Sequence, residues 1–166
     1  DIQEHMIMPI GFGSFHEALR AGTETYHILK NILKQKYGAK AILLGDEGGF
    51  APPIEDVEQR MELLMRAIKE SGYGNKIKLA LDCAASEFFD QKSHEYKILN
   101  KRYDKGELVD YYKALTRKFP IISIEDGMFQ DDWEGWALLS REIGGKIQLV
   151  GDDLLVTNIG RIKRGL

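Results

Sequence analysis

Apolar residues recur every three to four positions in several stretches of the chain, a spacing that predicts amphipathic helices with one buried face. Ser14 stands directly before the first of these stretches and is a residue type that caps helices. The second stretch follows Pro52–Pro53 and is stopped by Ser71–Gly72. The predicted helices cover residues 15–33, 54–68, 108–119 and 132–143, and Thr157 is expected to open a last one.

Short apolar runs bounded by turn residues lie between these helices and predict strands. One run lies near residues 5–9, and the others are Ile77–Asp82, Pro120–Asp126 and Ile147–Asp153. The segment Glu87–Leu99 is expected to be a surface excursion with a hairpin around residues 90–93. Strands that alternate with helices, without a linker or low-complexity stretch, predict an α/β fold of parallel β/α units.

Carboxylates end three of the predicted strands: Asp82, Glu125 and Asp152. The ends of parallel strands meet at one edge of the sheet, so these three side chains are expected to converge there. A single acid at such a place is usually a turn former or a helix cap. Three acids without a Cys or His partner favour a hard cation, with Mg²⁺ as the leading case. Asp126 and Asp153 follow directly, and spacing does not decide which member of each pair binds metal.

A second cluster of polar residues is the segment Gly45–Pro53, which holds Asp46 and Glu47 among three glycines. Glycines let a backbone turn tightly and let a ligand approach closely, and the two prolines stiffen the end of the segment. The segment is either a plain turn between helices or a loop that presents an acid. Gln3 and Glu4 place further polar groups beside the first predicted strand. They are either part of a functional site or simply frayed residues near the chain terminus.

Composition excludes several classes of function. The 23 Lys and Arg residues against 26 Asp and Glu give a net charge of −3, without the basic surface that nucleic acids require. The sequence also lacks an apolar run long enough for a membrane span. A single cysteine, Cys83, cannot form an intrachain disulfide, which favours a reducing, cytoplasmic compartment. The 166 residues fall short of the roughly 250 of a complete eight-stranded α/β barrel.

Five motifs, in this order and at these intervals, resemble enolase (phosphopyruvate hydratase). The motifs are Gln3–Pro9, Gly45–Pro52, Leu81–Phe88, Ser123–Met128 and Gly151–Asn158. The resemblance covers essentially the whole chain. It implies a fold that is part of an enolase-type TIM-like (β/α) barrel with about half of the strands present. Residues 1–166 would be a partial C-terminal barrel domain, without the family's N-terminal domain and the last part of the barrel.

The resemblance also implies roles for individual residues. Asp82, Glu125 and Asp152 match the carboxylate ligands of the catalytic Mg²⁺. Glu47 matches the general acid that protonates the departing hydroxyl, with Glu4 as a second acid beside it and Gln3 as a substrate contact. The implied reaction is the reversible dehydration of 2-phosphoglycerate to phosphoenolpyruvate, in which a lysine removes a proton and Mg²⁺ stabilises the enolate. Enzymes of the enolase superfamily commonly use a Lys or His as the base, together with one or two Mg²⁺ ions.

The family's base lysine matches no position of this chain, and its motif is expected beyond Leu166. The isolated chain is therefore expected to be catalytically incomplete. The alternative hypothesis is a non-catalytic barrel fragment or interaction module that keeps the metal-binding acids without turnover. For the parent protein the resemblance implies a small-molecule substrate, a homo-oligomer such as a dimer or octamer, and no nucleic acid partner. His5 stands where the family commonly has Phe.

Overall fold

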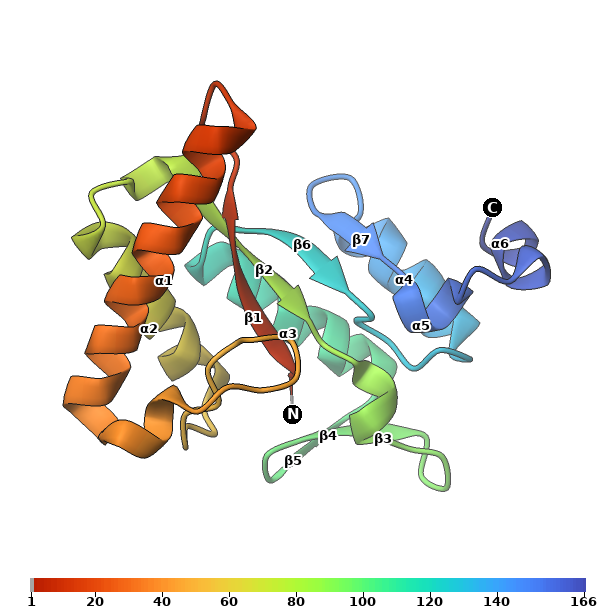
Figure 1. The fold of residues 1–166 in the computed structure, drawn as a ribbon. Helices are drawn as coiled ribbons and strands as arrows, with labels where there is room; N and C mark the ends of the chain where they lie inside the picture. The colour runs from red at the N-terminus through yellow and green to blue at the C-terminus, as the bar shows by residue number, and fades with distance from the viewer. Residues whose placement is uncertain (1) are drawn as a thin grey trace. The chain divides into compact units, whose positions relative to one another are not determined.

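A computed structural model describes residues 2–166 of the chain and contains helices and strands in alternation (Figure 1). The strands are β1 (Glu4–Pro9), β2 (Ile77–Asp82), β3 (Phe89–Asp90), β4 (Glu95–Ile98), β5 (Lys101–Tyr103), β6 (Ile121–Glu125) and β7 (Gln148–Val150). The helices are α1 (Phe15–Tyr37), α2 (Val57–Glu70), α3 (Lys105–Lys118), α4 (Trp133–Ile143), α5 (Asp152–Leu155) and α6 (Ile159–Gly165). Three short 3₁₀ turns are η1 (Ala39–Ile42), η2 (Gly74–Lys76) and η3 (Ala85–Phe88).

Four strands form an open sheet in the order β1-β2-β6-β7. The pairs β2–β6 and β6–β7 are both parallel, as the alternation of strands and helices predicts. The register places Asp82 opposite Glu125, and Glu125 opposite Val150. The predicted α/β fold of parallel units is therefore confirmed, and the last residues of β2 and β6 lie side by side.

The described chain divides into two compact units. The helical unit consists of Ile7–Lys78, in which α1 and α2 pack against each other (Figure 1). Ser14 caps α1 as predicted, because its hydroxyl accepts the Glu17 N–H at 3.2 Å. The core of this unit combines aliphatic residues from both helices and from the segments that follow α1: Ile32, Leu33, Ala41, Ile54, Leu63 and Ala67.

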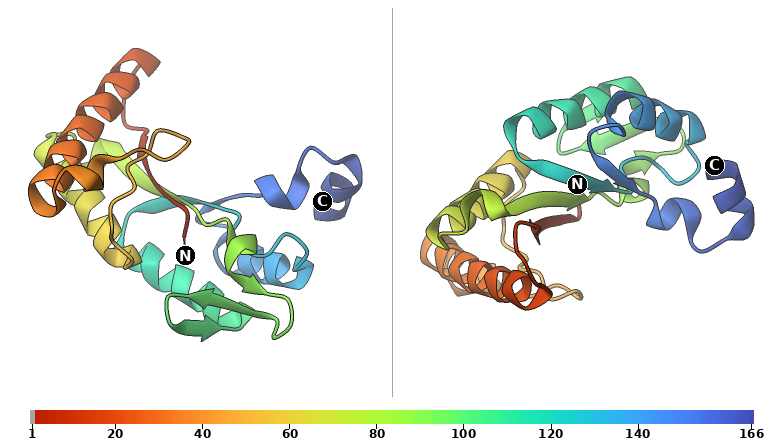
Figure 2. Two further views of the ribbon diagram at one scale, coloured as in Figure 1. Left: turned by 60° about the horizontal axis from the view of Figure 1, so that its bottom comes forward. Right: turned by 90° about the horizontal axis from the view of Figure 1, so that it is seen from above.

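The carboxylate unit consists of residues 2–6 and Leu79–Leu166. Two of its helices, α3 and α4, lie side by side and follow β5 and β6 respectively (Figure 2). A capping box at Asp104 and Glu107 starts α3, and Asp132 caps α4. Fully buried side chains from the strands and from α3, such as Leu81, Tyr112 and Ile124, fill its core. Among the described residues, no helix is both long and apolar enough to cross a membrane.

The structure differs from the sequence-based expectations in three places. The segment after β2 is no mere surface excursion: its hairpin continues into a third strand, β5, and the side chain of Tyr96 is fully buried. The run that was expected to be a strand up to Asp153 ends at Val150, where the short helix α5 follows. The last helix is capped by Asn158 instead of Thr157, because the Asn158 side chain accepts the N–H groups of Gly160 and Arg161.

Candidate metal and acid site

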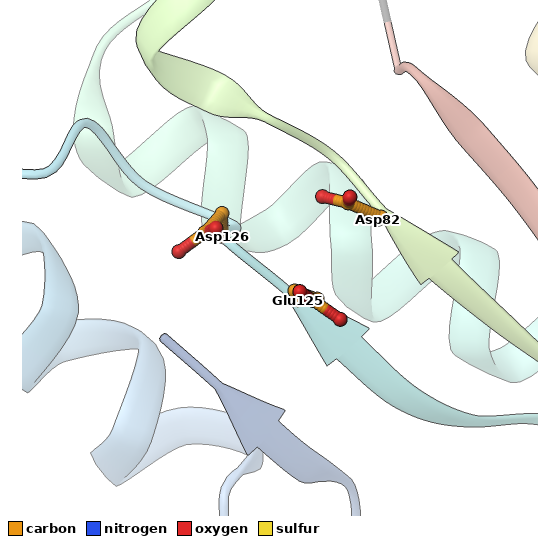
Figure 3. Close-up of side chains that lie close together, drawn as sticks. All are labelled: Asp82, Glu125 and Asp126. Carbon is orange, nitrogen blue, oxygen red and sulfur yellow. The ribbon is translucent and has the colours of Figure 1, made fainter. Parts of the chain in front are cut away.

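Three carboxylates come together where β2 and β6 end (Figure 3). Asp82 is the last residue of β2, Glu125 is the last residue of β6, and Asp126 follows it directly. Each offers one oxygen, and these oxygens all lie within 4.8 Å of one another. The parallel register brings Asp82 and Glu125 together, as predicted from their positions at strand ends.

Asp126 joins this group because the chain leaves the extended conformation at this residue. Consecutive side chains of a strand point to opposite faces of the sheet, so two adjacent acids would ordinarily diverge. Asp126 instead has a φ of 42°, in the left-handed region that Asp tolerates better than most residues. The change of backbone conformation lets both members of the pair contribute to one group of oxygens.

The carboxylate of Asp126 is buried and only partly satisfied. The residue is 4% exposed, and burial raises the pKa of its carboxyl above the ordinary value. Its Oδ2 accepts the backbone N–H of Asp153 at 2.9 Å. Its Oδ1 has no hydrogen-bond partner among the described residues. A buried carboxylate oxygen without a donor, close to two further carboxylates, is a site that a cation would stabilise.

Glu47 lies in the helical unit, at the tip of a tight loop. Backbone hydrogen bonds link Gly45 N–H to Gly49 C=O at 2.9 Å and Gly48 N–H to Gly45 C=O at 3.0 Å. Gly48 has a φ of 81°, which explains a glycine at this position. The Tyr26 hydroxyl donates to the Gly48 carbonyl at 2.9 Å, so a long-range contact holds the loop to α1. The exposed side chain of Glu47 is thus presented by an ordered loop.

The sequence matches one protein family over residues 1–166, and the description of this family is "Enolase, C-terminal TIM barrel domain". The chain belongs to the enolase family. It is 52% identical to the enolase of Thermococcus gammatolerans, 51% to that of Thermococcus kodakarensis and 48% to that of Methanocaldococcus jannaschii. Each match covers the whole chain, which spans 39% of the length of the two Thermococcus enolases and 38% of the Methanocaldococcus enolase. Membership in the enolase family confirms the predicted partial α/β barrel.

The remaining residues that the enolase resemblance singles out are not part of the three-carboxylate group. Asp152 is exposed and is the first residue of α5, so its role as a metal ligand stays a prediction. Gln3 is exposed just before β1, and Glu4 is the half-buried first residue of that strand. Their contacts with substrate also stay predictions.

Sequence patterns did not identify two tyrosines, one in each unit, that hold segments next to the predicted functional residues. Tyr26 holds the Glu47 loop, and Tyr96 holds the segment after Asp126 through a hydrogen bond from the Phe129 N–H at 3.1 Å. Neither lies in an informative motif, and only the tertiary structure reveals their contacts. Cys83, next to Asp82, is fully buried, and burial raises the pKa of its thiol to about 12. It is therefore a protonated packing residue directly after β2.

Proposed function

We propose that this chain carries the metal-binding carboxylates and the general acid of a Mg²⁺-dependent enolase, which interconverts 2-phosphoglycerate and phosphoenolpyruvate. Family membership supports this proposal, and the observation that carries it is the group formed by Asp82, Glu125 and Asp126. The donor set fits the cation that the family implies. All three groups offer hard oxygen ligands, and the buried Oδ1 of Asp126 has no hydrogen-bond donor among the described residues.

Asp82, Glu125 and Asp152 would hold the ion, with Asp126 close by. When bound, Mg²⁺ supplies concentrated positive charge that stabilises the enolate formed as the proton beside the substrate carboxylate is removed. Asp82 and Glu125 would hold that charge where β2 and β6 end. Asp82 is itself oriented by the backbone, because its Oδ1 accepts the Ala84 N–H at 3.1 Å.

Glu47 would act as the general acid. Hydroxide is a poor leaving group, so proton transfer to the departing oxygen from a positioned acid accelerates the reaction by about 10²–10⁴-fold. The ordered loop around Gly48 supplies this positioning, while the exposed carboxyl can reach a substrate. Glu4 would be a second acid of the site, and Gln3 would contact the substrate.

The base belongs to a part of the protein outside this sequence. None of the lysines present lies in a motif that matches the base of the family, so we assign the base to the remaining part of the barrel. We likewise propose that the chain is one portion of a C-terminal barrel domain. This agrees with a chain that spans 39% of the length of its Thermococcus relatives. The proposal includes a cytoplasmic, homo-oligomeric parent protein.

The metal site is tested by replacing its ligands one at a time in the 166-residue chain. We expect D82N and E125Q each to weaken Mg²⁺ binding by at least about tenfold, as loss of a direct ligand removes charge and a coordinating oxygen. D110N is the matched control, because Asp110 lies on α3 with its side chain 76% exposed. Unchanged Mg²⁺ affinity in both ligand variants would refute the assignment.

The catalytic role is tested in the complete protein that contains this sequence, by following the absorbance of phosphoenolpyruvate. We expect E47Q to reduce turnover by about 10²–10⁴-fold while Mg²⁺ binding is unchanged. A second candidate function is a module that binds metal without turnover, which the incomplete coverage of the relatives favours for the isolated chain. If the isolated chain binds metal and only the complete protein turns over substrate, the isolated chain is a metal-binding module and the complete protein is the enzyme.

A further inference from the structure

We propose that Asp126 is a positioning residue that joins the ends of β2, β6 and β7 and thereby sets the spacing of the metal-binding carboxylates. Its effect on metal affinity rests on the proposed function, whereas its bridging role can be measured independently. Asp126 directly follows the strand residue Glu125 and lies in the three-carboxylate group (Figure 3). Unlike a residue that bonds to one neighbouring strand, Asp126 forms hydrogen bonds to three separate segments through its N–H, its carbonyl and its side chain.

The backbone of Asp126 connects its own strand to both neighbouring strand ends. Its N–H donates to the carbonyl of Val150, the last residue of β7, at 3.0 Å. Its carbonyl accepts the N–H of Ala85, just after β2, at 3.0 Å. A third bond nearby, from the Cys83 N–H to the Glu125 carbonyl at 2.9 Å, continues the pairing of β2 and β6. The ends of three strands are thus linked through one residue.

The side chain of Asp126 adds a link to the segment that carries Asp152. The short helix α5 begins at Asp152, and its N-cap is Gly151, which has no side chain to accept an N–H. Asp126 Oδ2, on the residue directly after β6, fulfils this function, because it accepts the Asp153 N–H at 2.9 Å. Asp126 therefore holds the amide group that joins Asp152 to Asp153.

The conformation of Asp126 supports a positioning role. A residue other than Gly at a φ of 42° is uncommon and is retained only where its surroundings determine it. The bonds to Val150, Ala85 and Asp153 are those surroundings. Asp126 is only 4% exposed, so the side-chain bond is largely shielded from competing solvent. Outer groups that orient metal ligands commonly change metal affinity about 10- to 100-fold when removed.

Two substitutions separate the bridge from the charge. D126N keeps an acceptor for the Asp153 N–H and a residue type that tolerates the left-handed region, but it removes the charge. D126E keeps the charge but moves the acceptor away by one methylene. If Asp126 acts by positioning, D126E binds metal about 10- to 100-fold more weakly than the unsubstituted chain. D126N loses a negative charge near the cation but keeps the bridge, so it binds metal more tightly than D126E. The reverse order, or equal losses in both, would overturn the proposal.

The measurement is a Mn²⁺ titration of the 166-residue chain, followed by the loss of the electron paramagnetic resonance signal of free Mn²⁺. D110N, the same kind of substitution on an exposed face of α3, is the control for charge alone. Hydrogen exchange of the Asp153 amide gives a second readout that needs no metal. We expect protection of this amide in the unsubstituted chain and in D126N, and its loss in D126E.

These two readouts keep the proposals distinguishable. If the unsubstituted chain does not bind Mn²⁺, the metal site of the proposed function fails, and amide exchange alone decides the role of Asp126. If the Asp153 amide exchanges equally in all variants, the bridge through Asp126 is wrong, even where the metal binds.

Discussion

The buried hydroxyl of Tyr96 connects the hairpin to the segment that follows the three-carboxylate group. Tyr96 is fully buried on β4, and burial raises the pKa of its hydroxyl, which therefore stays protonated. The hydroxyl donates to Asp132 Oδ2 at 2.8 Å and accepts the Phe129 N–H at 3.1 Å. Asp132 in turn caps α4 by accepting the Gly135 N–H at 2.9 Å. One hydroxyl thus fixes both ends of the turn between the site and α4.

The substitution Y96F removes this hydroxyl and keeps the ring. A hydrogen bond to a neutral group contributes about 1 kcal/mol, and one to a charged group contributes about 1.5–3 kcal/mol. The loss also leaves the Phe129 N–H without its acceptor, while Asp132 keeps Lys105 as an ion-pair partner at 3.5 Å. We therefore expect Y96F to lower the free energy of unfolding by about 2–4 kcal/mol.

Urea unfolding followed by tryptophan fluorescence measures this change, since Trp133 and Trp136 both lie on α4, the helix that Asp132 caps. The shift of the midpoint at constant slope gives the difference in free energy. Y103F is the matched control: Tyr103 is half-buried on β5, and its loss of a hydroxyl should change stability by less than about 0.5 kcal/mol. Equal midpoints for Y96F and Y103F would refute the reasoning.

Three further predictions concern contacts outside the carboxylate group. Y26F should loosen the Glu47 loop by about 1 kcal/mol, seen as faster hydrogen exchange of the Gly48 amide, because it removes the bond to the Gly48 carbonyl. D104A should destabilise the chain by about 1 kcal/mol in urea unfolding, since it removes the capping box of α3. The hydrogen bond from Tyr73 lowers the pKa of Glu24, so the unfolded state takes up the proton first as the pH falls. The stability from this contact is therefore lost below about pH 4.3, and urea midpoints of E24Q against pH should lack that decrease.

Much of the fold could be predicted because it follows from local patterns. Helical spacing of apolar residues and the cap at Ser14 located α1, and a short apolar run located β2. The convergence of Asp82 and Glu125 followed from one topological rule, that parallel strands end at the same edge. In each of these cases the deciding information lies within a few neighbouring residues or in the order of the elements.

The other features depend on contacts that sequence patterns do not contain. The buried hydroxyl of Tyr96 bonds to Phe129 and Asp132, which are 33 and 36 positions away in the chain. A hairpin rich in polar residues therefore looked like a surface excursion. The Tyr26 contact with Gly48 likewise spans 22 positions. Long-range hydrogen bonds of this kind set the position of a loop without leaving a periodic signal.

The two acid pairs at the strand ends also could not be ranked by spacing, and the structure gives the physical reason. In the first pair, Glu125 ends a strand and Asp126 turns into the left-handed region, where its side chain becomes an acceptor. In the second pair, Asp152 and Asp153 begin a helix, and the Asp153 N–H is the donor to that acceptor. The second acid of each pair therefore takes a different part in the same hydrogen bond: Asp126 accepts it and Asp153 donates it. The bond makes the position of Asp152 depend on Asp126, so the two pairs are best tested as one coupled unit: the effects of D126E and D152N on metal affinity should not be additive.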